Sequence, residues 1–242
     1  MFDRKKYKDF AKRQLKGRWT VPVIMTLIIV VIMFLFDIPN IIRLFTDEAF
    51  WKLMYFEGDI TEAYDLYNQV SSHSNSYLTS IIQVVAEAIL SFAAINVYLK
   101  MSRSPEKISL KLFIEGLNNW ARAFLAALWK YLWVFIWSLL FFIPGIIKAI
   151  SYSQMYYILC EYKDFSVTKA MRISMIITYG HKGDLFVTYL SFLGWLLLSV
   201  LTFGIGALWL QPYMDMTLIN AYHALMKEAL ETGKIKPEDL TE

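Results

Sequence analysis

Three ionisable side chains lie in otherwise apolar stretches of the sequence: Glu87, Lys130 and Asp215. Charged groups inside a membrane are costly, so they face a bundle interior or a water-filled cavity and often mark an ion or proton pathway. Counting about 1.5 Å of helix rise per residue from the ends of the apolar stretches places all three within the reach of one lysine side chain. The sequence therefore predicts an intramembrane polar cluster of these three residues.

Two interpretations of this cluster remain open, an ion or proton pathway and a buried pair that only fixes helix register. A water-accessible cavity that reaches Glu87 and Asp215 would favour the pathway. Gln211 and Pro212 are a second candidate feature, because proline removes a backbone hydrogen bond and can break a helix. Broken helices line substrate sites in transporters, whereas a lone proline near a helix start is also a simple kink.

Signatures of enzymatic chemistry are not found in this sequence. It holds no HExxH, no GxSxG and no phosphate-binding glycine loop. The three histidines, His73, His181 and His223, follow no metal-ligand spacing, and the single Cys160 excludes an intramolecular disulfide. We therefore expect no enzymatic activity, no cofactor and no metal site.

The composition indicates a membrane protein. Of 242 residues 57% are hydrophobic, and the mean hydropathy is +0.42, too apolar for a soluble surface. Apolar stretches of the length that a bilayer requires, about 20 residues, recur along the chain, the fourth being shorter. They cover residues 19–36, 77–101, 121–143, 146–160, 185–203 and 207–226. The predicted fold is all-α, a polytopic membrane protein with six transmembrane helices plus amphipathic interfacial helices.

Two breaks separate the later stretches. Pro144 and Gly145 are expected to end the third span, and a tight turn over 202–206 is expected to join the fifth span to the sixth. A short helix over 166–179, with Ser166 as its N-cap and Gly180 as its stop, is too short to span and is expected to lie at the membrane interface.

The first 18 residues form a predicted basic amphipathic helix. They hold eight Lys and Arg against two acids, and their apolar side chains fall on one side at helical spacing. These apolar residues are Tyr7, Phe10, Ala11 and Leu15. The pattern is typical of a helix on an anionic membrane surface, and its place directly before a span disfavours nucleic acid as the partner.

Residues 37–76 have the opposite character. Seven acids stand against Arg43 and Lys52, and aromatic residues are frequent. The pattern predicts two short amphipathic helices with a break at Gly58 and Asp59, followed by a polar hinge over 71–76.

The distribution of basic residues predicts the orientation. Four segments hold 20 of the 24 Lys and Arg residues and alternate with segments that hold few or none. These basic segments are 1–18, 100–122, 161–184 and 227–242. The positive-inside rule then places both termini in the cytoplasm and the acidic segment outside the cell membrane. The expected organisation is a cytoplasmic helix (1–18), a membrane domain (19–226) that includes the acidic loop, and a charged, frayed cytoplasmic tail (227–242).

Several stretches resemble a known family. They read FIPGIIKAISYSQMYYILCEY, SVTKAMRISMII, GHKGDLFVTYLSFLGWLLLSVLTFGIGALWLQPY and NAYHAL, and AKRQLKGRW near the start fits the same pattern. They are similar to a family of bacterial integral membrane proteins, common in Gram-positive species, that is catalogued as domain of unknown function 975. The likeness is strongest over 140–226 and weakest over 37–76. The resemblance implies a six-helix bacterial membrane protein and supplies no activity, cofactor or catalytic residue.

These observations favour an uncharacterised, non-enzymatic scaffold or accessory protein that acts through protein or lipid contacts. Its expected partners are the anionic lipids of the inner leaflet, and a membrane protein or a second copy of the chain. A small transporter or channel component that uses the mid-membrane charges is the alternative. A third hypothesis is an envelope-homeostasis factor whose partner performs the chemistry.

Overall fold

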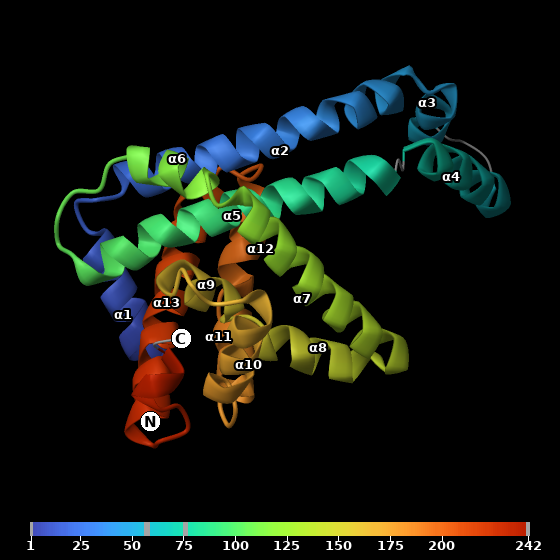
Figure 1. The fold of residues 1–242 in the computed structure, drawn as a ribbon. Coiled ribbons are helices and arrows are strands. Elements are labelled where there is room, and N and C mark those ends of the chain that lie inside the picture. The colour runs from blue at the N-terminus through green and yellow to red at the C-terminus, as the bar shows by residue number, and fades with distance from the viewer. Residues whose placement is uncertain (1, 56–58, 75–76, 241–242) are drawn as a thin grey trace. The chain divides into compact units, whose positions relative to one another are not determined.

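A computed structural model describes residues 2–55, 59–74 and 77–240, and within these residues every regular element is a helix (Figure 1). The chain divides into two compact units. The bundle unit comprises residues 1–27 and 88–242, and the hairpin unit comprises residues 28–87. Each unit is described by itself.

The bundle unit is built from short and medium helices. They are α1 (Arg4–Leu15), α6 (Lys111–Leu117), α7 (Trp120–Leu140), α8 (Phe142–Ser151), α9 (Met155–Glu161), α10 (Val167–Ile177), α11 (Lys182–Leu190), α12 (Leu193–Leu201), α13 (Ala207–Glu231) and a 3-10 helix (Pro237–Leu240). The hairpin unit contains α3 (Glu48–Met54) and α4 (Ile60–Ser74). Two long helices, α2 (Thr20–Thr46) and α5 (Tyr77–Arg103), have residues in both units.

Helix α13 is the central helix of the bundle unit, because α1, α10 and α12 all pack against it. Its middle is wholly buried from residue 216 to residue 222, and Met216, Thr217 and Tyr222 are fully enclosed. The prediction that 207–226 forms an apolar span is not confirmed, because polar residues such as Asn220 and His223 make this helix less apolar than the candidate spans.

Among the described residues, four helices are long and apolar enough to cross a membrane. They cover Thr20–Thr46, Thr79–Arg103, Trp120–Leu139 and Lys182–Leu201, the last with a turn at residues 191–192. Six spans are therefore not confirmed. These four helices still supply the apolar surface of a membrane protein, since most of their side chains are not buried within the chain.

The predicted fourth span over 146–160 is broken into α8, of 10 residues, and α9, of 7 residues. Ser174 on α10 stabilises the break: its Oγ donates to the carbonyl of Ser151 at 2.7 Å and accepts from the N–H of Gln154 at 3.2 Å. Each piece is well below the roughly 20 residues that a span requires.

The third span ends three residues earlier than predicted. The chain reverses at Phe141, whose backbone is extended (φ −161°, ψ 147°). Pro144 and Gly145 lie inside the first turn of α8, where proline costs no hydrogen bond because the first N–H groups of a helix have no partner within it. Gly145 permits close packing, since an added Cβ would lie 3.1 Å from the Cα of Ser138 on α7.

The predicted helix over 166–179 is present as α10, and its cap is confirmed. The Oγ of Ser166 accepts from the N–H of Lys169 at 3.2 Å, and Gly180 adopts a positive φ of 90° after the helix. However, α10 packs against α7, α9 and α13 with Ala170 and Ser174 fully buried. Helix α10 therefore packs one face into the bundle, while Thr168 and Arg172 on its other side are exposed, and its place at the membrane interface stays a prediction.

In the hairpin unit, helix α2 continues past the predicted end of the first span, through Pro39 to Thr46. Asp37, expected in the loop, is thus helical, and it accepts a hydrogen bond from Gln83 of α5 at 2.6 Å. Helices α3 and α4 match the two short amphipathic helices of the prediction. Asp59 caps α4 by accepting from two backbone N–H groups, while Gly58 lies outside the described residues. The predicted hinge is helical up to Ser74, and residues 75–76 lie outside the described residues.

The tail is more ordered than predicted. Helix α13 continues to Glu231, and the side chain of Ile235 is only 2% exposed. The N–H of Ile235 donates to the carbonyl of Ala229 at 3.1 Å, which folds the chain back onto the end of α13.

Candidate functional site

The basic helix α1 lies along α13. The side chains of Tyr7, Ala11 and Leu15 are buried, so the apolar face that we expected to meet lipid is covered by protein. Gln14 fixes the register: its Nε2 donates to the carbonyl of Ser102 at 2.9 Å, and its Oε1 accepts from Nδ2 of Asn220 at 2.8 Å. The arrangement leaves the basic side of α1 facing outward.

Three basic residues at four-residue spacing follow one side of α1 past α11 and α12. Arg4 donates to the carbonyl of Val187, and Lys8 to the carbonyl of Ser191, each at 3.3 Å. The Lys8 ammonium also lies 4.0 Å from the centre of the Phe192 ring. Burial lowers the pKa of Lys8, and the nearby charges of Arg4 and Lys12 lower the pKa further.

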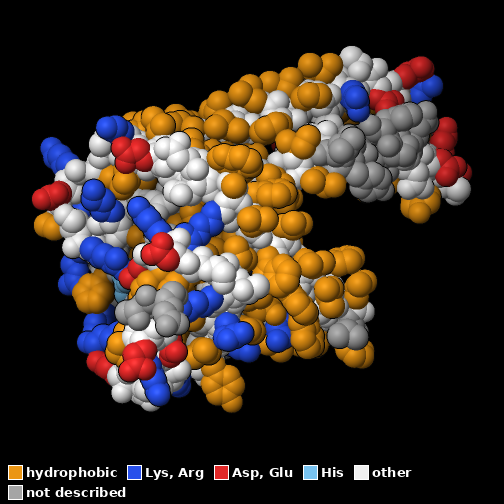
Figure 2. Space-filling view, in the orientation of Figure 1, with side chains coloured by type: hydrophobic (Ala, Val, Ile, Leu, Met, Phe, Trp, Pro, Cys, Tyr) orange, Lys and Arg blue, Asp and Glu red, His pale blue; other side chains and the backbone are white. Residues whose placement is uncertain are grey.

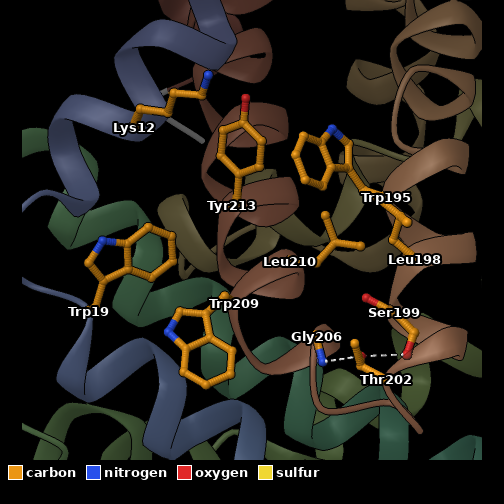
Figure 3. A pocket seen from close by; sticks show the side chains of 10 residues that line it. All are labelled: Lys12, Trp19, Trp195, Leu198, Ser199, Thr202, Gly206, Trp209, Leu210 and Tyr213. Atoms are coloured by element: carbon orange, nitrogen blue, oxygen red, sulfur yellow. Dashed lines mark hydrogen bonds between the residues drawn. The ribbon is translucent and has the colours of Figure 1, made fainter.

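Next to the third of these cations, Lys12, a cavity of about 500 Å³ opens between α12 and α13 (Figure 3). It is lined by Lys12, Trp19, Trp195, Leu198, Ser199, Thr202, Gly206, Trp209, Leu210 and Tyr213. Lys12 and the hydroxyl of Tyr213 lie at one end of the cavity, and the turn that joins α12 to α13 lies at the other. The Lys12 ammonium is 5.7 Å from the centre of the Tyr213 ring. The cavity is thus apolar along its length and cationic at one end.

The turn at the other end is compact. Phe203 and Gly204 adopt positive φ values of 51° and 82°, which reverse the chain within a few residues. The Oγ1 of Thr202 donates to the carbonyl of Ser199 at 2.9 Å and accepts from the N–H of Gly206 at 3.0 Å. An added Cβ on Gly206 would lie 2.8 Å from the Oγ of Ser199, so glycine lets the two helices approach.

Two members of the predicted polar cluster, Lys130 and Asp215, contact different side chains within the bundle unit. Asp215 accepts from Nε2 of Gln211 on its own helix, at 3.1 and 3.2 Å. Lys130 points from α7 toward α9, where its ammonium lies 4.9 Å from the centre of the Tyr156 ring. Within the described residues no ion pair joins Lys130 to Asp215. Glu87 is exposed and belongs to the hairpin unit.

Gln211 and Pro212 do not break their helix. Helix α13 runs from Ala207 to Glu231, with Pro212 buried inside it. Gln211 serves instead as the hydrogen-bond donor to Asp215 one turn later. The predicted helix break is therefore not present: α13 is continuous through Pro212, although proline there cannot donate a backbone hydrogen bond.

A polar network that sequence reasoning missed joins α5, α9 and α13. Arg103 pairs with Glu161 at 2.5 Å, and the Tyr222 hydroxyl donates to the other carboxylate oxygen of Glu161 at 2.6 Å. These residues are about 60 positions apart in the chain, and no local pattern relates them. The network ties the central helix to its neighbours.

Beside it, the Oγ of Ser102 lies 2.9 Å from Nε2 of His223. The same hydroxyl lies 2.7 Å from the carbonyl of Leu99. A hydroxyl has one proton, so when it donates to Leu99 the imidazole must be the donor to Ser102.

The described residues contain no group of three or more His, Cys, Asp or Glu side chains that could hold a metal ion.

Comparison with known proteins gives one family. The family model described as protein of unknown function (DUF975) matches residues 1–151 and 142–229. No curated protein and no solved structure matches this chain. Since the two matched segments cover well over half of the chain, this protein belongs to the DUF975 family of proteins of unknown function.

Proposed function

We propose that this protein is a non-enzymatic, multi-pass protein of the bacterial cell membrane that acts through contacts with lipids and membrane proteins. The observation that carries the proposal is the arrangement of α1, which buries its apolar face on α13 and leaves a basic surface outward. Figure 2 shows Lys and Arg side chains gathered at the end of the bundle unit where α1 lies. The exposed cations of this α1 surface are Arg4, Lys5, Lys6, Lys12, Arg13 and Lys16.

A cationic surface of this kind suits anionic lipid headgroups. Helix α1 leads within a few residues into α2, one of the four candidate spans, so its charges lie close to the membrane. A base near an anionic membrane surface contributes about 1 kcal/mol of attraction. The attraction is screened over about 10 Å at 0.1 M salt, so it depends on ionic strength.

The same charge distribution supports the orientation. The basic segments belong in the cytoplasm under the positive-inside rule, and the acidic residues of 37–76 belong outside. Single cysteines at Ser74 or Lys234, in a Cys160→Ala background, are expected to react with an impermeant maleimide in intact cells only at Ser74. Labelling at Lys234 would overturn this orientation.

A transporter or channel component is the second candidate, and one observation favours it. Asp215 is an ionisable group in the central helix α13, next to the fully buried Met216 and Thr217, and it is held by Gln211 of the same helix. Such a group could take part in proton movement. However, the cavity beside Lys12 is lined by apolar residues and not by Asp215, which favours the first candidate.

The test uses the purified full-length protein in nanodiscs of mixed phosphatidylcholine and phosphatidylglycerol. We expect phosphatidylglycerol to be enriched around the protein at low salt and less so at high salt. Lys5→Gln with Lys6→Gln should reduce the enrichment, whereas the matched control, Arg43→Gln with Lys52→Gln in the hairpin unit, should not.

Equal enrichment in both double variants would reject the basic surface as a lipid contact. In parallel, proteoliposomes with a pH gradient test the second candidate. A proton leak that Asp215→Asn abolishes would replace the first candidate by the second.

A further inference from the structure

We propose that the cavity between α12 and α13 binds one acyl chain of an anionic glycerophospholipid, with the lipid phosphate at Lys12. The inference rests on the proposed function for the presence of anionic lipid beside α1. It names the lipid class and the residues that would select it.

The lining of the cavity specifies an apolar occupant. Trp19, Trp195 and Trp209 contribute aromatic surface, and Leu198 and Leu210 contribute aliphatic surface. Its volume of about 500 Å³ falls within the range of small-molecule sites. Burial of apolar surface contributes roughly 25 cal/mol per Å², so an acyl chain gains from every methylene it places there.

The charged end specifies an anionic headgroup. The Lys12 ammonium provides three donors and a full positive charge, and the Tyr213 hydroxyl lies at the same end. A phosphate diester offers acceptor oxygens to both groups, and hydrogen bonds between ionised partners are the strong ones. Lys8, one turn earlier on α1, adds positive charge. A zwitterionic lipid would bring its own cation to this position and gain less.

The other end requires no second polar group. There the hydroxyl of Thr202 already donates to Ser199 and accepts from Gly206. From Gly206 to Tyr213 the cavity follows seven residues of α13, about 10 Å of helix. The site is therefore polar at one end only, as a lipid with one headgroup and one inserted chain requires.

The first test needs no variant. Phosphatidylglycerol with brominated acyl chains should quench the tryptophan fluorescence of the full-length protein in detergent. Unbrominated phosphatidylglycerol should reverse the quenching at several-fold lower concentration than phosphatidylcholine with the same chains. Equal potency of the two competitors would overturn the selectivity, and no reversal by either would overturn the site.

The second test fills the cavity while keeping every charge. Leu198→Trp should abolish the retention of phosphatidylglycerol by the protein, which native mass spectrometry measures. Leu197→Trp places the same side chain on the exposed face of α12 and should leave the lipid bound. Circular dichroism and gel filtration confirm that both variants fold, and equal lipid retention by both would reject the cavity as the site.

The third test separates this inference from the proposed function. Lys12→Gln should lower phosphatidylglycerol retention to the level of phosphatidylcholine, and Lys5→Gln on the same helix should not. If Lys12→Gln has no effect while the nanodisc enrichment still depends on Lys5 and Lys6, the cavity proposal fails alone. If the enrichment is absent but Leu198→Trp removes a retained lipid, the basic surface fails alone.

Discussion

Two helical hairpins of the bundle unit, α7–α8 and α12–α13, share one construction. In each, a serine near the end of the first helix faces a glycine at the start of the second, seven positions later, either inside the first turn or directly before it. The pairs are Ser138 with Gly145, and Ser199 with Gly206. An exposed phenylalanine lies between the two residues of each pair. It is Phe141 in the first hairpin and Phe203, which is 99% exposed, in the second.

The two hairpins differ in what lies beside this junction. In α7–α8, the ammonium of Lys148 lies 4.4 Å from the centre of the Trp137 ring, so the hairpin supplies its own aromatic and cationic partners. The equivalent positions in α12–α13 are Leu198 and Trp209, and both line the open cavity. There the cation, Lys12, comes from α1. One hairpin is therefore self-contained, and the other is completed from outside.

The largest expected effect concerns the shared glycines. Gly145→Ala and Gly206→Ala should each destabilise the protein by about 1–3 kcal/mol, because the added Cβ forces the paired helices apart. Gly194→Ala on α12 is the matched control, since within the described part of the chain its Cβ would meet no atom within 4 Å. Thermal unfolding in detergent measures all three. If the three variants behaved alike, close approach at the glycines would not be the cause.

A smaller effect is expected when α12–α13 receives the aromatic and cationic side chains of α7–α8. Leu198→Trp with Trp209→Lys gives α12–α13 the residue types that α7–α8 carries at the same positions. We expect the melting temperature of this double variant to lose its dependence on added phosphatidylglycerol, because a ligand stabilises a protein only when it binds the folded state. A melting temperature that still rises with this lipid, as in the unaltered protein, would contradict the comparison.

The smallest effect should be the coupling between Lys130 of the first hairpin and Asp215 of the second. The structure places the Lys130 ammonium over Tyr156 and gives Asp215 a donor in Gln211. Lys130→Met and Asp215→Asn should therefore be additive within about 0.5 kcal/mol in a double-variant cycle of thermal stability. Partial recovery of stability in the double variant would instead show that Lys130 and Asp215 form the ion pair that the sequence predicted.

The sequence was sufficient to predict features that depend only on neighbouring residues. The cap at Ser166 and the helix stop at Gly180 each depend on a few neighbouring residues. The apolar face of α1 was also predicted, but not the surface that covers it. A lipid and the side of α13 are both apolar, so Tyr7 and Leu15 carry no information that separates them.

Features that depend on distant residues were not predictable. Ser102 and His223 meet at a sequence separation of 121, and nothing near either residue indicates the other. Depth along a helix brought Lys130 and Asp215 to a similar level but could not give the direction of each side chain around its helix. Pro144 was ambiguous for a related reason, because proline suits both a break and the first turn of a helix.

Lys12 of α1 lies beside Tyr213 of α13, and this position determines how deep the α12–α13 hairpin reaches into the membrane. About 10 Å of helix separates Tyr213 from Gly206, whereas the hydrocarbon core of a bilayer is about 30 Å thick. With Lys12 at a headgroup, the turn at Phe203 lies inside the hydrocarbon, and α12–α13 forms a re-entrant loop that enters and leaves by one face.

Such a loop must satisfy its own backbone, because no water is available at that depth. The turn meets this requirement. The N–H groups of Phe203 and Gly204 donate to carbonyls of α12, that of Ile205 donates to the carbonyl of Thr202, and that of Gly206 donates to the hydroxyl of the same threonine. Both ends of a re-entrant loop therefore lie on the same face of the membrane.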